Sequence, residues 1–198
     1  MPGQESLIVR HRLAQEFGLT LQAFRYSATS STMSEITARL ASFVAELKAP
    51  SVHFLGHSLG GLVIHRFLER FPEQPPGRAV FLGTPCVASR AAQRAGRFTP
   101  VAHLMGPSVA QELLQPQERR WTVPRELGII AGSQPLGMGQ LLAHFDEEND
   151  GTVAVSETRM PGATDHIVLP VSHLGMLLST RVARETGTFL TRGRFSLQ

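Results

Sequence analysis

The sequence predicts an α/β fold, with a mostly parallel β-sheet that carries helices on both of its faces. Two observations favour this fold. Short apolar segments of strand length alternate with amphipathic helical segments over most of the chain, as strands and crossover helices do in parallel sheets. The 198 residues are 42% hydrophobic and 18% charged, which suits one globular domain with enough apolar side chains for a core. We therefore expect a single domain over residues 1–198.

The N-terminal part of the chain predicts two helices with an extended segment between them. Residues 4–17 form the first expected helix, which ends at Gly18. Its expected inward positions are Leu7, Ile8, Ala14 and Phe17. Residues 19–26 predict a strand. The second helix is expected to lie between a cap at Ser34 and a stop at Pro50. Its apolar positions recur every three or four residues, at Ile36, Leu40, Phe43 and Leu47.

The rest of the chain alternates strands and helices around one long insertion. A strand, a helix and a strand are expected over residues 51–55, 60–71 and 78–82. Residues 84–124 are polar and rich in arginine, with scattered apolar positions, and we expect them to form a cap-like insertion. Two strands and a closing helix complete the expected domain, over residues 127–132, 166–169 and 174–190.

Composition and charge exclude several classes of function. The formal charge is +3, and the clustered arginines are not interleaved with aromatic side chains, so we expect no nucleic-acid partner. Cys86 is the only cysteine and has no Cys or His neighbours at metal-ligand spacing, so we expect no metal site. No apolar run approaches the roughly 20 residues that cross a bilayer. The N-terminal residues also lack a secretion-signal pattern, and we expect a cytoplasmic protein without an integral membrane segment.

A G-x-S-x-G sequence lies between an expected strand and an expected helix. Gly56-His57-Ser58-Leu59-Gly60 fits the nucleophile elbow, in which a sharp strand-to-helix turn raises a serine hydroxyl above the end of a sheet. Small flanking residues let the strand and the helix come close together. Ser58 is therefore the candidate nucleophile. The plainer interpretation is a tight, glycine-rich turn without catalysis.

A serine nucleophile needs an imidazole to accept its proton and a carboxylate to orient that imidazole. The chain has three aspartates, all downstream of the motif: Asp146, Asp150 and Asp165. Asp150 is favoured because it lies in a turn-forming stretch after the expected strand over residues 127–132, where a loop carboxylate can reach the carboxyl edge of the sheet. Asp146 is the nearer rival. An ordinary Asx turn is the plainer interpretation of Asp150.

Eight histidines are candidates for the base. His173 is favoured because it follows the last expected strand, at the same sheet edge as Ser58, and completes the chain order serine, aspartate, histidine. His166 is the rival, although it begins that strand. His57 is next to the nucleophile and is expected to line the substrate pocket. Two others are expected to be structural, His53 and His65.

Residues 56–61, 149–153 and 171–173 together resemble the lipase/esterase branch of the α/β-hydrolase superfamily, and the resemblance covers nearly the whole chain. It implies an α/β-hydrolase fold with a short cap segment. It also implies that Ser58 is the nucleophile, His173 the base and Asp150 the orienting acid. The backbone N–H of Leu59 is then an oxyanion-hole donor, and Thr84 lies beside the acyl pocket. Such enzymes cleave a carboxylic ester, here an ester or thioester of a small molecule, without a metal or an organic cofactor.

One departure from the family's pattern concerns the oxyanion hole. The family takes a second backbone donor from a loop after a strand that precedes the elbow and ends in His-Gly, and this sequence has no His-Gly pair. The elbow strand is then expected to pair with residues 19–26 or to keep an open edge. We hypothesise that Met1 is an internal methionine of a longer product. A non-catalytic binding protein of the same fold is the second class of function that fits.

Overall fold

The structure, a computed structural model, describes residues 7–27, 29–87, 119–135 and 147–196. Within these residues there are four strands, β1 (Phe54–His57), β2 (Ala79–Leu82), β3 (Leu127–Gly132) and β4 (Asp165–Leu169). The α-helices are α1 (Leu7–Phe17), α2 (Met33–Leu47), α3 (Leu59–Arg70) and α7 (Thr180–Arg192). Two short 3-10 helices follow the last two strands, η2 (Ser156–Thr158) and η3 (Gly175–Leu177).

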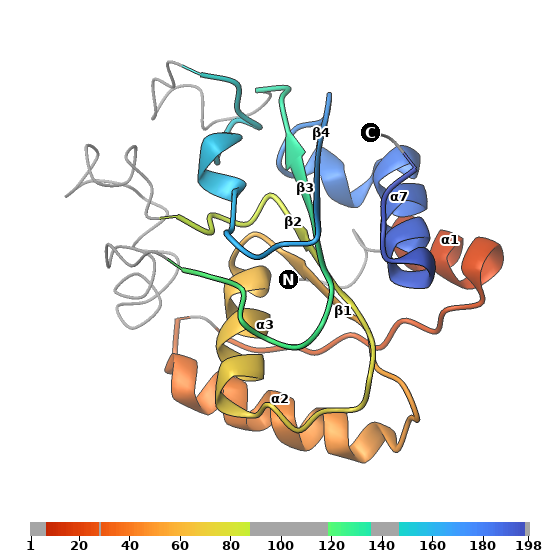
Figure 1. The fold of residues 1–198 in the computed structure, drawn as a ribbon, viewed down its shortest axis with the longest axis vertical. Helices are drawn as coiled ribbons and strands as arrows, with labels where there is room; N and C mark the ends of the chain where they lie inside the picture. Colours follow the sequence, from red (N-terminus) through yellow and green to blue (C-terminus); the bar gives the residue numbers. More distant parts are fainter. Residues whose placement is uncertain (1–6, 28, 88–118, 136–146, 197–198) are drawn as a thin grey trace.

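The four strands form one parallel sheet in the order β1-β2-β3-β4. Their carboxyl ends therefore lie at one edge of the sheet (Figure 1). The predicted strands over residues 51–55, 78–82, 127–132 and 166–169 are all present. β3 has the predicted bounds, whereas β1 reaches two residues further into the motif than expected. The parallel sheet of the predicted fold class is confirmed.

Helices cover both faces of the sheet, as predicted (Figure 1). α2 and α3 pack together on one face, and α1 and α7 pack together on the other. Neighbouring residues of β2 point to different faces: Phe81 joins the core on the α2–α3 side, and Val80 and Leu82 join the core on the α7 side. Such alternation places apolar side chains on both sides of a strand, which is typical of parallel sheets buried on both faces.

α2 is amphipathic as predicted, but it begins at a different cap. Its buried stripe consists of Ile36, Leu40 and Val44. The cap is Thr32: its hydroxyl accepts a hydrogen bond from the N–H of Glu35 at 3.2 Å, and its own N–H donates to the Glu35 carboxylate at 2.7 Å. This reciprocal capping box requires a Glu or Gln three residues after the cap. Thr32 has one and Ser34 does not, so the predicted cap at Ser34 is wrong.

α1 buries a different face from the one predicted. Val9 and Leu13 are 2% and 1% exposed, whereas Ala14 is exposed. Phe17 is partly buried against α7, where its ring occupies the space that a side chain at Gly187 would need. The side chains of Leu7 and Ile8 lie outside the described part. The helix is therefore confirmed over Leu7–Phe17, and the inward position predicted for Ala14 is wrong.

The strand predicted over residues 19–26 is wrong, because this segment has no regular secondary structure. It leads from α1 on one face of the sheet to α2 on the other (Figure 1). Leu19 and Leu21 pack against the core beside α1, and Phe24 and Tyr26 pack against the core beside α2. These contacts explain the apolar pattern without a sheet. Among the described strands, β1 is therefore an outer strand, which pairs with β2 alone.

The predicted closing helix over residues 174–190 is divided into η3 and α7. The break occurs because Ser179 caps the second helix, accepting a hydrogen bond from the N–H of Val182 at 3.3 Å. α7 then continues to Arg192, and Gly193 follows with a φ of 76°. In the part of the chain that the structure describes, no helix is both long and apolar enough to span a bilayer.

Most of the predicted cap-like insertion over residues 84–124, namely residues 88–118, lies outside the described residues. The described ends of the insertion pack on the core. Cys86 and Trp121 are 1% and 5% exposed. The Trp121 ring packs edge-on against Phe81, with ring centroids 5.7 Å apart, and its indole N–H donates to the Arg125 carbonyl at 2.6 Å. Both ends are thus fixed to the domain.

Candidate active site

Ser58 occupies a strained turn between β1 and α3. Its φ is 54° and its ψ is −124°, a conformation that non-glycine residues rarely adopt and that costs about 1–3 kcal/mol. It stands at the N-cap position of α3, yet its hydroxyl makes no capping hydrogen bond to that helix. A serine at this position ordinarily uses its hydroxyl as a cap. The Ser58 hydroxyl is therefore not used to cap α3.

The backbone of Ser58 is fixed from three directions. Its N–H donates to the Leu82 carbonyl of β2 at 2.8 Å. Its carbonyl accepts from the Thr84 hydroxyl at 2.9 Å and from the N–H of Gly61 at 3.1 Å. Thr84 is fully buried. The neighbouring strand and the loop after it thus hold the strained conformation in place, as strained residues at functional sites require.

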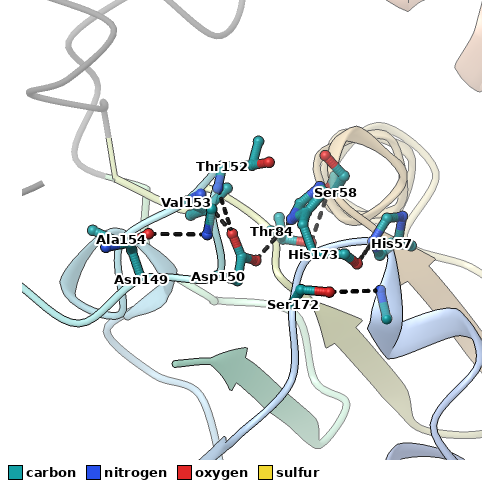
Figure 2. A network of polar contacts seen from close by, with 12 residues as sticks. His57, Ser58, Thr84, Asn149, Asp150, Thr152, Val153, Ala154, Ser172 and His173 are labelled. Carbon is teal, nitrogen blue, oxygen red and sulfur yellow. Dashed lines mark hydrogen bonds and ion pairs between the residues drawn. The ribbon is translucent and has the colours of Figure 1, made fainter. Parts of the chain in front are cut away.

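Asp150 lies on a tight loop after β3 and is fully buried. Oδ1 accepts hydrogen bonds from the N–H groups of Thr152 at 2.9 Å and Val153 at 2.7 Å. Oδ2 accepts from Nδ1 of His173 at 2.7 Å (Figure 2). The predicted Asx turn and the predicted carboxylate–imidazole contact therefore coexist: one oxygen closes the turn, and the other faces the imidazole.

The contact with Asp150 determines which nitrogen of His173 carries a proton. Both oxygens of a carboxylate are acceptors, so Nδ1 is the donor and carries the hydrogen. In the neutral ring, Nε2 then has a free lone pair, which is the form that a general base needs. The His173 side chain is 10% exposed. The backbone N–H of His173 also donates to the Asp150 carbonyl at 2.9 Å, so the two loops are joined twice.

Gly83 lies directly against the pair, a contact that the sequence did not predict. A Cβ at Gly83 would lie 2.9 Å from Oδ2 of Asp150 and 3.1 Å from Nδ1 of His173. Its φ is 52°, which also favours glycine. Met176, fully buried, packs at the same place. The end of β2 therefore approaches the Asp150–His173 pair as closely as the backbone allows.

His57 and Thr84, the two predicted substrate contacts, both lie at this edge of the sheet (Figure 2). Nε2 of His57 is 2.8 Å from the His173 carbonyl oxygen, and the two imidazole rings are 4.6 Å apart between centroids. Burial and the nearby His173 lower the pKa of His57 to about 4. The hydroxyl of Thr84 is engaged with Ser58. Contact of either residue with a substrate stays a prediction.

The rival acid and base are not part of this cluster. His166 lies near the start of β4, where Nε2 of its ring is 2.8 Å from the Thr158 hydroxyl. Asp165 accepts hydrogen bonds from the N–H of its neighbour His166 and, at 2.9 Å, from the N–H of Phe195. The amino end of β4 is the sheet edge opposite Ser58. Asp146 lies outside the described residues.

Three other residues with reactive side chains have structural contacts in the domain. His65 is 1% exposed and stacks on Trp121 at 5.7 Å between ring centroids. His53 accepts a hydrogen bond from the N–H of Arg78 at 3.0 Å. Burial raises the pKa of the Cys86 thiol to about 12, so it is not a thiolate near neutral pH. Within the described residues, no group of three or more side chains is arranged to hold a metal ion.

Leu59 is the first residue of α3 and directly follows Ser58, so its backbone N–H lies at the N-terminus of the helix. A helix has no carbonyl one turn before its first residues, so these N–H groups lack intrahelical acceptors. The helix dipole adds positive potential at the same point. An N–H group that lacks an intrahelical acceptor therefore lies directly after Ser58. Its contact with a reacting oxygen stays a prediction.

Comparisons with known proteins identify the fold. No family model and no curated protein matches the sequence. The mature form of the lipase BlEst2 from Bacillus licheniformis is 20% identical, with a TM-score of 0.63 over 81% of this chain and 74% of that one. The pyrethroid hydrolase PytH is 16% identical, with a TM-score of 0.60 over 96% of this chain and 94% of that one. An α/β-hydrolase fold protein from Chitinophaga pinensis is 13% identical, with a TM-score of 0.52 over 83% and 74% of the two chains. The chain has the α/β-hydrolase fold.

Replacing Gly83 by Ala tests the close approach to the Asp150–His173 pair. We expect the ester hydrolysis proposed below to slow at least tenfold, because the new methyl group must displace Oδ2 or Nδ1. Gly18→Ala is the matched control: its φ is also positive, at 65°, but a Cβ there meets no atom within 4 Å. Backbone strain should cost each variant about 1 kcal/mol, and Gly83→Ala should lose further stability because its methyl group meets buried atoms. Equal turnover in the two variants would show that Gly83 does not support the pair.

Proposed function

We propose that the chain is a serine hydrolase that cleaves a carboxylic ester or thioester through an acyl-enzyme on Ser58. The observation that carries the proposal is the buried hydrogen bond between Asp150 and His173, at the same sheet edge as a strained serine whose hydroxyl is not used as a cap. A nucleophile, a base and an orienting acid are the components that acyl transfer requires. The names of the structural neighbours, a lipase and a pyrethroid hydrolase, support hydrolase chemistry.

In the first half of the reaction, Oγ of Ser58 attacks the acyl carbon while Nε2 of His173 takes the hydroxyl proton. The charge that develops on His173 is stabilised by the Asp150 carboxylate. The N–H of Leu59 faces the negative charge on the substrate oxygen. The carbon–oxygen or carbon–sulfur bond then breaks, and His173 returns the proton to the leaving alcohol or thiol.

In the second half of the reaction, water attacks the acyl group on Ser58. His173 accepts a proton from the water and then gives it to Oγ of Ser58 as the carboxylic acid leaves. The Asp150–His173 pair is 0% and 10% exposed in its side chains, so the acid is shielded while the base remains reachable. This difference suits a base that must exchange protons with substrate and water.

Labelling with a fluorophosphonate probe tests the proposal. The probe should attach covalently to Ser58 in the wild-type chain, as mass spectrometry of the peptide would show. Ser58→Ala should abolish labelling and ester turnover, because it removes the proposed nucleophile. Ser156→Ala, which removes an exposed hydroxyl bonded to Glu147, should leave both unchanged. A folded wild-type protein that is neither labelled nor active would overturn the proposal.

A non-catalytic binding protein of the same fold is the second candidate. The observation that favours it is the missing His-Gly pair, because loss of one oxyanion-hole donor lowers turnover by about a hundred- to a thousand-fold. In that case the Asp150–His173 pair would remain folded and Ser58 would stay unlabelled.

A further inference from the structure

His57 connects the strand of the nucleophile with the loop of the base. It is the last residue of β1 and directly precedes Ser58. Nε2 of its ring lies 2.8 Å from the backbone oxygen of His173, and the two rings are tilted by 45° (Figure 2). The two residues are 116 positions apart in the sequence. A single side chain thus joins two parts of the site that come from opposite halves of the chain.

The contacts of His57 define its protonation state. A carbonyl oxygen can only accept, so Nε2 of His57 carries the hydrogen. Nδ1 is buried and has no hydrogen-bond partner among the described residues, so a second proton there would have no acceptor. His57 is therefore a neutral donor. The lowered pKa of about 4 agrees with this geometry, since burial and the charge of His173 both oppose a proton on His57.

The backbone of His173 is held on both sides by hydrogen bonds. Its N–H donates to the Asp150 carbonyl at 2.9 Å, which ties the base to the loop of the acid. Its carbonyl accepts from His57, which ties the base to β1. Among the hydrogen bonds of the described residues, only the His57 bond joins the loop of the base directly to the strand of the nucleophile. It is therefore a direct link between the residue before Ser58 and the backbone of the base.

We propose that His57 is a positioning residue for the hydrolysis, which holds the His173 peptide group with its Nε2–H and supports the His173 ring with its own. The proposal rests on the proposed function. A displacement of about 1 Å between reacting groups can cost a hundredfold in rate. The neutral state is part of the role, because His173 becomes positively charged during acylation and a second positive ring 4.6 Å away would oppose that charge.

Two variants of His57 test the proposal through kcat and KM for a soluble short-chain ester. His57→Phe keeps a ring but removes the donor, and kcat should fall 10- to 100-fold with KM within about twofold of wild type. His57→Gln keeps an N–H donor of similar reach and should restore most of kcat. His53→Gln, directly before the opposite end of β1, should keep wild-type kcat. Wild-type kcat in His57→Phe would overturn the proposal, and so would a raised KM with unchanged kcat, which is the signature of a substrate contact.

Acid unfolding provides a readout that does not depend on activity. The titratable groups that face His57 are His173 and Asp150. The unfolded chain binds a proton on His57 near pH 6.5, whereas the folded chain does so only near pH 4. The contribution of neutral His57 to the free energy of unfolding is therefore fully present above about pH 6.5 and is lost as the pH falls towards 4. The melting temperature of wild type should fall more steeply over this range than that of His57→Gln. Equal slopes of melting temperature against pH would overturn the assignment of His57 as a neutral donor. This readout holds even if wild type proved inactive and the proposed function failed.

Discussion

Replacing Asp150 by Asn is expected to lower kcat for ester hydrolysis by about ten-thousand-fold while the chain stays folded. The amide oxygen can still accept the hydrogen bonds from the N–H groups of Thr152 and Val153, so the loop keeps its turn. The amide nitrogen then faces Nδ1 of His173 and donates to it. His173 must carry its hydrogen on Nε2, where the proton of Ser58 should go. Steady-state kinetics together with a thermal melt would measure both effects.

The rival assignment of the acid supplies the control for this experiment. Asp146→Asn should leave kcat within about twofold of wild type. The reverse ranking of the two variants would contradict the assignment of Asp150. Asp165→Asn makes a second comparison, because Asp165 holds the N–H of Phe195 at 2.9 Å at the opposite edge of the sheet. It should lower stability without a comparable loss of kcat.

The sheet could be predicted because the apolar pattern of each strand's sequence matches the burial of that strand in the fold. β3 is apolar over its whole length and is buried on both faces, so a short, continuous apolar run of strand length locates it. The same agreement fails at residues 19–26. Phe24 and Tyr26 pack against the α2–α3 side and Leu19 against the other, so the apolar pattern comes from bridging two cores and not from pairing with a strand. No local signal distinguishes these two causes.

The three proposed triad residues could be predicted, because each role requires a particular residue type and the three follow one another in a fixed order along the chain. Ser58, Asp150 and His173 follow strands whose carboxyl ends share an edge, and this rule requires no knowledge of side-chain contacts. The roles of Gly83 and His57 could not be found in this way. Both depend on how closely separate loops approach, such as the 3.1 Å between a Cβ at Gly83 and Nδ1 of His173. A sequence records the residue but not that distance.

Replacing Gly56 by Ala is expected to destabilise the protein by about 3 kcal/mol or more, the largest stability effect among the motif glycines. A Cβ at Gly56 would lie 2.5 Å from the backbone nitrogen of Gly61 and 2.7 Å from its Cα. These are backbone atoms of α3, and they cannot move away by changing a rotamer. The start of α3 would have to move away from the end of β1. A denaturant titration would measure the loss as a lower midpoint with an unchanged slope.

Gly60→Ala is the matched control within the same motif. Gly60 lies in the first turn of α3, and a Cβ there meets no atom within 4 Å. Ala is a better helix former than Gly by up to about 1 kcal/mol, so this variant should be as stable as wild type or more stable. Residual Gly56→Ala protein should also label slowly with the fluorophosphonate, because Ser58 stands on the turn that the methyl group opens. If Gly56→Ala and Gly60→Ala were equally stable, the turn at Ser58 would tolerate a wider separation of β1 and α3. The strained backbone of Ser58 would then not depend on the contact between these two elements.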